Sequence, residues 1–346
     1  MVHDAGRGGP GISIFPMEKR EYTHGLFQEP RPGTSGTGDA VALPDFFVIG
    51  APDAGTEVLH EELGRHRSVF MSEIPQPGYF LAGRILESGL DVTTAGRAGV
   101  VCSVWDKAGG SAGRPGCVAR AGPGERSPVR RRSDYEALFD AAPAGAVRGE
   151  STPYYLADFT ALRHIHELLP YAKLIVVLRD PVERAYANWV RMRLAGLEDL
   201  DDFERAVAAE AARTAACWPW PWRYLALGRY GTQLQRLFTL FPREQVLLTA
   251  HRDLIGDPAA VIRRAHGFLG VKLGVKRRGR PGPPGTSVPT PPSVPTPPSV
   301  PAFPAPRLDP AIGARLRDGF RSDIALLSDV TRRRFDEWLV EPADDS

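Results

Sequence analysis

The chain has 346 residues, of which 42% are hydrophobic, so it can bury a full core as one large domain with appendages. Its 43 basic and 41 acidic residues leave a net charge of +2, which excludes the concentrated basic surface of a general nucleic-acid-binding protein. The three cysteines lack the spacing of metal ligands, so we expect no metal site. The sequence shows no leader pattern and no apolar run of membrane length, and we therefore expect a cytoplasmic protein without a membrane partner.

The first predicted structural unit is a strand followed by a tight loop. Residues 1–43 are rich in Gly, Pro and Thr without apolar periodicity, and we expect a flexible N-terminal arm there. An apolar strand over 46–49 then breaks at Gly50, and a helix begins near Thr56. A loop of this kind points backbone N–H groups and the positive end of a helix dipole at one place, as in phosphate-binding sites. Two prolines keep the following segment, 74–80, irregular.

Strands and helices alternate through the rest of the main domain, 44–275. Beyond the first pair, we expect strands over 69–71, 146–150, 173–178 and 245–249, and helices over 135–142, 159–169, 181–194, 202–216, 230–241 and 258–269. The order predicts an α/β fold: a single P-loop-like domain with a central, mainly parallel sheet flanked by helices. Gly-rich residues 89–133 interrupt it as a mobile insertion, either a solvated loop or an anion-attracting lid.

The C-terminal part divides into a Pro-rich linker and a helical segment. Residues 276–307 contain Thr-Pro-Pro-Ser-Val-Pro twice, which predicts an extended polyproline spacer. Residues 308–340 have an amphipathic helical pattern with a break expected near Gly319, and we expect this segment to pack on the domain.

Three tryptophans alternate with prolines within residues 218–224, a pattern that blocks regular structure. Trp218, Trp220 and Trp222 form either a wall of the core or a hydrophobic lip for an aromatic substrate.

Four segments together resemble the sulfotransferases that depend on 3′-phosphoadenosine-5′-phosphosulfate (PAPS), in particular their bacterial and heparan-type branch. Residues 46–59 resemble the segment that holds the 5′-phosphosulfate, and 149–155 resemble the second active-site segment. Residues 178–186 are similar to the segment that binds the 3′-phosphate, and 230–269 to a later helix-strand-helix unit.

The resemblance implies a set of binding residues. Gly55, Thr56 and Arg179 are the nucleotide ligands that remain, if a nucleotide binds at all. The same resemblance places three further residues in the pocket for the acceptor substrate: Gln76, Tyr79 and Ser151.

Several residues differ from the family pattern at positions that, in the family, assist the transfer or bind the phosphates. Asp53 stands where the family has its transfer-assisting lysine, and Glu57 where it has a second phosphate-binding hydroxyl. Gln76 replaces the glutamate that acts as base, Ser151 replaces a lysine, and Ala187 replaces the 3′-phosphate serine. Two unit charges about 4 Å apart interact by roughly 4 kcal/mol at an effective dielectric near 20. An aspartate in place of a lysine therefore counts against tight PAPS binding.

Our first hypothesis is a sulfotransferase-fold enzyme repurposed for acid/base chemistry without PAPS or another cofactor. Asp53, Glu57 and His60 would be its catalytic set, and its substrate a small aromatic molecule of secondary metabolism, such as antibiotic biosynthesis. The purely structural alternative is that Asp53 accepts hydrogen bonds from the N–H groups of its own loop and that Glu57 interacts with the dipole at the start of the helix. His60 would then have a structural role.

Two further hypotheses stay open, as does assembly into a homo-oligomer. One is a PAPS-dependent sulfotransferase acting on a small-molecule hydroxyl with displaced cations, such as Arg84, Arg184 or the pair Arg277 and Arg278. The other is a non-catalytic scaffold whose Pro-rich tract binds a partner.

Overall fold

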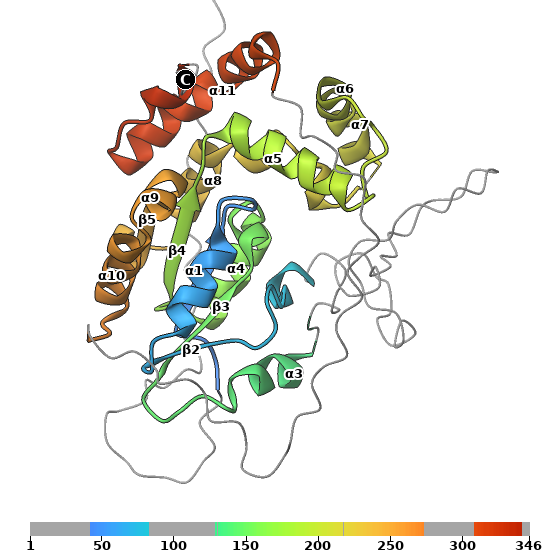
Figure 1. The fold of residues 1–346 in the computed structure, drawn as a ribbon. Coiled ribbons are helices and arrows are strands. Elements are labelled where there is room, and N and C mark those ends of the chain that lie inside the picture. Colours follow the sequence, from blue (N-terminus) through green and yellow to red (C-terminus); the bar gives the residue numbers. More distant parts are fainter. Residues whose placement is uncertain (1–41, 83–128, 130, 217, 273–307, 341–346) are drawn as a thin grey trace, which may run out of the picture. The chain divides into compact units, whose positions relative to one another are not determined.

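The computed structural model describes residues 42–82, 129, 131–216, 218–272 and 308–340. Its centre is a five-stranded sheet in the order β2-β3-β1-β4-β5, in which every neighbouring pair is parallel (Figure 1). The strands are β1 (Phe46–Gly50), β2 (Val69–Met71), β3 (Val147–Ser151), β4 (Lys173–Leu178) and β5 (Val246–Ala250). The predicted α/β fold with a parallel sheet flanked by helices is confirmed.

Helices cover both faces of this sheet. They are α1 (Thr56–Gly64), α3 (Arg132–Glu136), α4 (Phe159–Leu168), α5 (Pro181–Leu194), α6 (Phe203–Ala208), α7 (Glu210–Ala215), α8 (Tyr230–Leu237), α9 (His251–Gly256), α10 (Pro258–Leu269) and α11 (Pro310–Thr331). The chain leaves β1 toward the β2 edge and leaves β3 toward the β4 edge, so right-handed crossovers place α1 and α4 on opposite faces. In agreement, α1 packs against α10 and α4 against α8. The central strand β1 is fully buried between these layers.

The strand register brings the predicted site segments to one edge. Val48 of β1 lies beside Ser151 of β3 and beside Ile175 of β4. Because all strands are parallel, the loops that follow β1, β3 and β4 meet at the carboxyl edge of the sheet, where open α/β folds bind their ligands. The loop of Asp53, the end of β3 and Arg179 after β4 therefore share one region.

Some elements differ from the sequence-based expectation. The helix expected over 202–216 is divided into α6 and α7, and the short helix α9 was not predicted. The predicted break at Gly319 is wrong, because α11 continues through it and ends at Arg332, which has a left-handed φ of 56°. A glycine costs about 1 kcal/mol in a helix interior, and burial of Phe320 and Ile324 offsets that cost.

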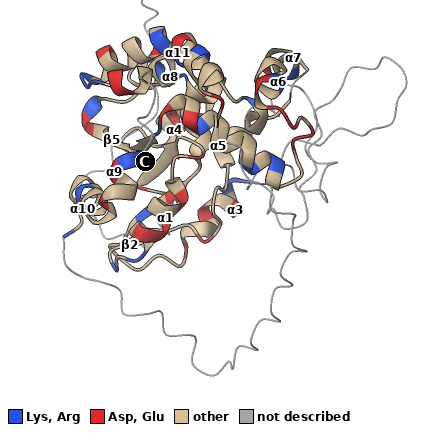
Figure 2. Ribbon diagram, turned by 45° about the horizontal axis from the view of Figure 1, so that its top comes forward, with Lys and Arg blue, Asp and Glu red and all other residues tan. Residues whose placement is uncertain are grey.

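Charged residues of both signs are interspersed along the helices, as the colours of the ribbon in Figure 2 show. Within the described ranges, no helix is long and apolar enough to cross a membrane. Nor does this part of the chain gather three or more His, Cys, Asp or Glu side chains where they could hold a metal ion.

The contact between α8 and α11 depends on a glycine and an aspartate. The Asp323 carboxylate accepts hydrogen bonds from the Gly231 N–H at 2.8 Å and the Thr232 N–H at 3.0 Å, which are orphan donors in the first turn of α8. A Cβ atom at Gly231 would lie 2.2 Å from the Asp323 carbonyl oxygen. The two helix backbones approach this closely only because residue 231 has no side chain.

We predict opposite effects for two glycine substitutions. Gly231→Ala must push α11 away and should lower the free energy of unfolding by about 1–3 kcal/mol. Gly319→Ala meets nothing within 4 Å and should raise it by up to about 1 kcal/mol, because alanine favours helix. Urea denaturation of both variants measures the difference; equal effects would contradict this packing.

Candidate functional site

The loop after β1 leads into a helix whose N-terminus has no side-chain cap. Gly55, the N-cap residue of α1, has a φ of 86°, and Asp53 before it a φ of 60°. Aspartates cap α4 and α5, where Asp158 and Asp180 accept first-turn N–H groups. At α1 no side chain among the described residues does so, and there the first-turn N–H groups are open to another acceptor.

The Asp53 carboxylate is held in an ion pair that the sequence did not suggest. Arg191 in the last turn of α5 donates from Nε to Asp53 Oδ1 at 2.6 Å and from Nη2 to Oδ2 at 3.3 Å. The Asp53 side chain is only 10% exposed, whereas that of Arg191 is 48% exposed. Burial lowers the pKa of Arg191, but its hydrogen bonds and the charge of Asp53 outweigh this and raise it overall. The acid that replaces the family's lysine thus has a cation as its direct partner.

Two more arginines belong to the same segment, and one of them contacts the loop. Arg179 donates from Nη1 to the Asp53 carbonyl oxygen at 3.3 Å and from Nε to Glu183 at 3.4 Å, at the loop where a nucleotide ligand is expected. Arg184 is completely buried and donates to the Tyr224 carbonyl oxygen. Arg84, Arg277 and Arg278, the other cations considered from the sequence, lie outside the described residues.

The three predicted acid/base residues are not joined to one another by hydrogen bonds in the described structure. Glu57 is exposed and accepts from the Thr56 hydroxyl at 3.3 Å and from Gln76 Nε2 at 3.4 Å. His60 is hydrogen-bonded to the Ser72 backbone, and its Nδ1 is buried without a partner. Burial lowers the pKa of His60, which keeps its ring neutral at neutral pH. Their catalytic roles stay predictions.

The predicted acceptor-side residues lie at the turn over 75–82 and at the end of β3. Gln76 is exposed and reaches Glu57, as described above. The Tyr79 ring stacks on Tyr135, with centroids 4.3 Å apart and planes 10° apart. Ser151 is buried, with 3% of its surface exposed.

The tryptophan segment forms one short 3₁₀ helix, Trp220–Trp222, and is otherwise irregular. Trp222 is buried, and Trp218 packs edge-on against it at 5.4 Å. The half-buried Trp218 and Trp220 each lie under an arginine, Arg213 at 4.8 Å and Arg223 at 4.3 Å. Trp222 therefore belongs to the core, while Trp218 and Trp220 keep a partly open surface.

Sequence reasoning missed Glu150, the residue before Ser151. Its carboxylate is completely buried and accepts from the hydroxyls of Tyr135 at 2.7 Å, Thr152 at 2.8 Å and Tyr155 at 3.1 Å. Burial raises the pKa of Glu150 to about 7, against the lowering effect of these hydrogen bonds. The sequence did offer one signal, a glutamate within a predicted core strand. A buried glutamate is rarely without a hydrogen-bonding partner.

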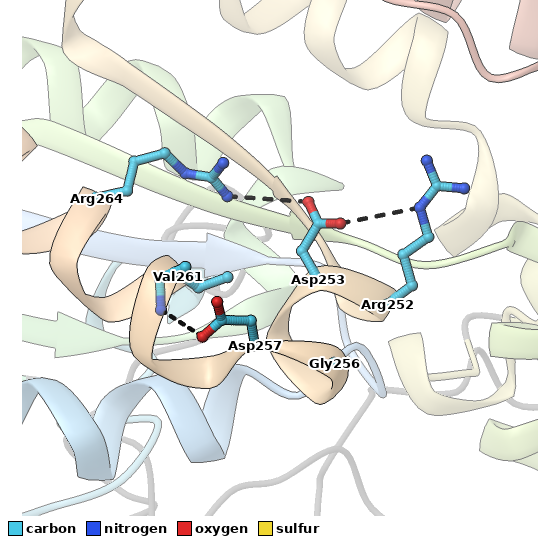
Figure 3. Close-up of a pocket in the computed structure, with 7 residues that line it drawn as sticks. Arg252, Asp253, Gly256, Asp257, Val261 and Arg264 are labelled. Carbon is cyan, nitrogen blue, oxygen red and sulfur yellow. Dashed lines mark hydrogen bonds and ion pairs between the residues drawn. The ribbon is translucent and has the colours of Figure 1, made fainter.

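A hollow of about 460 Å³ lies elsewhere, between α9 and α10 (Figure 3). Within it the Asp253 carboxylate lies between Arg252 at 3.9 Å and Arg264 at 4.0 Å, and Arg252 also pairs with Glu337. Asp257, which also lines the hollow, caps α10 by accepting from the Ala260 N–H at 2.9 Å, and the hollow contains none of the predicted site residues.

Comparisons with known proteins agree on one family. The sequence model described as "Sulfotransferase family" matches residues 44–274. Human heparan sulfate glucosamine 3-O-sulfotransferase 3B1 is 33% identical over 138 residues, covering 40% of this chain and 35% of that protein. Human bifunctional heparan sulfate N-deacetylase/N-sulfotransferase 2 is 26% identical over 236 residues, covering 66% of this chain and 22% of that protein. The chain thus spans about a third or less of the length of these curated relatives.

A solved structure shares the fold. The crystal structure of a sulfotransferase from Alicyclobacillus acidocaldarius superposes with a TM-score of 0.62, covers 86% of this chain and 99% of that chain, and is 23% identical in sequence.

The position of Glu150 predicts a pH-dependent stability. A carboxyl group whose pKa is 4.5 unfolded and about 7 folded stabilises the fold fully below pH 4.5, and this contribution is lost as the pH rises through 7. The loss should approach about 3 kcal/mol at pH 8. Urea denaturation between pH 5 and 8.5 should show a steeper decline for the wild type than for Glu150→Gln. The exposed control Glu167→Gln should keep the wild-type decline, and equal slopes for all three proteins would refute the raised pKa.

Proposed function

The chain belongs to the sulfotransferase family, and we propose that it transfers a sulfuryl group from PAPS to the hydroxyl of a small molecule. In this proposal Arg191 offsets the negative charge that Asp53 places where the family has its lysine. The observation that carries the proposal is the Arg191 guanidinium 2.6 Å from the Asp53 carboxylate, at the loop that leads into the uncapped helix α1.

The residues at the loop fit a phosphosulfate. The first-turn N–H groups of α1 lack a side-chain cap, and Thr56 offers a hydroxyl beside them. Arg179 reaches the loop from the end of β4 and Arg191 reaches it from α5. PAPS, when bound, supplies the sulfuryl group; the chain would hold its phosphates with these donors.

The ion pair weakens the electrostatic argument against PAPS. At about 4 Å and an effective dielectric near 20, the repulsion from Asp53 and the attraction from Arg191 are each roughly 4 kcal/mol and opposite in sign. The aspartate therefore no longer counts as an uncompensated negative charge. This is why we place PAPS-dependent transfer before the PAPS-independent chemistry that the sequence favoured.

We assign Glu57 as the base for the acceptor hydroxyl. Gln76 stands where the family has its glutamate, and an amide cannot take a proton at useful pH. Glu57 Oε1 lies 3.4 Å from Gln76 Nε2 and is exposed, so a carboxylate is present one side chain away from the usual position. The proton of the attacking hydroxyl would pass to Glu57 as the hydroxyl oxygen bonds to sulfur. The bond between that sulfur and the phosphate oxygen of PAPS would break in the same transfer, so that adenosine 3′,5′-bisphosphate leaves.

We infer the substrate class from aromatic side chains that the sequence placed in the substrate pocket. Tyr79, Trp218 and Trp220 present partly open aromatic surfaces, which favour a flat or aromatic acceptor. A cytoplasmic place of action and a role in secondary metabolism, such as antibiotic biosynthesis, belong to the same proposal.

A second candidate is acid/base chemistry without PAPS on a molecule of the same class. It is favoured by the exposed Glu57 carboxylate and by His60 one turn along α1, whose burial lowers its pKa and keeps the imidazole neutral. A product that forms in the absence of PAPS, and that is lost in both Glu57→Gln and His60→Gln, would replace the first candidate by this one.

We predict that Arg191→Met reduces PAPS-dependent transfer, measured as kcat/KM on a panel of hydroxylated aromatic acceptors. The expected loss is about 100-fold, the usual cost of removing one electrostatic donor from an active site, because Asp53 then repels the donor substrate unopposed. The exposed control Arg163→Met, on α4, should keep wild-type rates. Undiminished transfer in Arg191→Met would exclude this role, and no sulfated product from the wild type across the panel would count against the proposed function.

A further inference from the structure

The turn over residues 75–82 carries two predicted substrate-binding side chains but has little regular structure of its own. Only its last part is a 3₁₀ helix, Tyr79–Ala82. Gln76 has a φ of 54° and Gly78 a φ of 67°, a left-handed conformation that a glutamine rarely adopts. Contacts from outside the turn must therefore hold it in this shape.

Two hydroxyl groups hold the turn's backbone. The Gly78 N–H donates to Thr152 Oγ1 at 3.2 Å, and the Phe80 N–H donates to Tyr155 Oη at 3.4 Å. Each hydroxyl in turn donates its own hydrogen to Glu150: Thr152 to Oε2 at 2.8 Å and Tyr155 to Oε1 at 3.1 Å. Both connections run in one direction, from the backbone N–H through a hydroxyl to the buried carboxylate.

A third hydroxyl holds the turn through a ring. Tyr135 Oη donates to Glu150 Oε1 at 2.7 Å, and the Tyr135 ring stacks on Tyr79 at 4.3 Å. Phe80 packs edge-on against the rings of Tyr135 at 5.6 Å and Tyr155 at 5.8 Å. All three hydroxyl groups that accept from the turn, or whose rings pack against it, thus converge on one carboxylate.

We infer that Glu150 is a positioning residue, whose buried carboxylate orients three hydroxyls and so fixes the turn that presents Gln76 and Tyr79 to the acceptor. A hydroxyl has one hydrogen, and because Glu150 takes it, the oxygen lone pairs of Thr152 and Tyr155 are left to accept from the turn. Only the statement that the turn meets an acceptor rests on the proposed function.

The connection continues to the loop. Gln76 Nε2 donates to Glu57 Oε1 at 3.4 Å, on the helix that begins at the loop of Asp53. A displaced turn would therefore also move the amide that holds the proposed base.

Amide hydrogen exchange tests this inference without any substrate. The comparison is made at pH 8, where the wild-type Glu150 is ionised and accepts through both oxygens. In Glu150→Gln, a glutamine amide can accept through one oxygen only, so exchange at Gly78 and Phe80 should accelerate about tenfold or more relative to the amides of β4. The matched control is Glu198→Gln, which alters another buried carboxylate that accepts a tyrosine hydroxyl, from Tyr224 at 2.7 Å. It should leave the turn's exchange unchanged relative to β4. Acceleration of the turn and β4 alike in Glu150→Gln would overturn the inference.

Variants of the two hydroxyls keep the test decisive if Glu150→Gln does not fold. Thr152→Val cuts only the connection to Gly78, and Tyr155→Phe cuts only the connection to Phe80. Each should accelerate exchange mainly at its own amide. Equal effects at both amides in each variant, or none in either, would contradict two separate connections through Glu150.

A kinetic measurement adds the functional part. The Tyr155→Phe variant should raise KM for the acceptor about tenfold while the affinity for adenosine 3′,5′-bisphosphate stays at the wild-type value. An unchanged KM beside accelerated exchange would remove the acceptor role but leave the positioning of the turn. If the wild type shows no transfer at all while exchange responds as expected, the proposed function fails and the positioning role stands.

Discussion

The ion pair between Asp53 and Arg191 is the interaction on which the character of this site depends. Asp53 lies in the loop after β1, and Arg191 lies in the last turn of α5, the helix that follows β4. Their pairing requires parallel β1 and β4 to end at one edge, so that α5 returns past the loop. Without the arginine, the loop would combine an anion-binding backbone with an anion of its own. With it, the charge is balanced within the protein.

The site then has two halves that meet at one contact. On the side of the proposed nucleotide site, the start of α1 has no side-chain cap and two arginines donate to Asp53 of the loop. On the side of the proposed acceptor site, the buried carboxylate of Glu150 accepts from two hydroxyls to which the turn over 75–82 donates. The hydrogen bond from Gln76 to Glu57 joins the halves. The family pattern has a lysine and a glutamate at these two places. In this chain we propose that Arg191 and Glu57 take their parts.

The fold could be predicted from the sequence because its signals are local and strong. The β-branched run of β4, and Pro181 after the capping Asp180, fix a buried strand and the start of the next helix, and α5 was predicted with its true bounds. The charge balance of the site could not be predicted. Arg191 and Asp53 are 138 residues apart, and a single sequence contains no pattern that links them. Glu150 was passed over for a similar reason. Thr152 and Tyr155 follow it closely in the chain, but only the folded backbone turns their hydroxyls toward its carboxylate and brings Tyr135 of α3 to the same place. Gly319 shows the opposite failure, a local breaker that tertiary packing overrides.

Calorimetric titration of the wild-type chain with adenosine 3′,5′-bisphosphate tests the central claim most directly, because it needs neither an acceptor nor turnover. If Arg191 neutralises Asp53, the loop remains an anion site, and the account predicts micromolar or tighter binding that tightens further in Asp53→Asn, where the arginine is released from its partner. No binding at millimolar ligand, in both the wild type and Asp53→Asn, would contradict it.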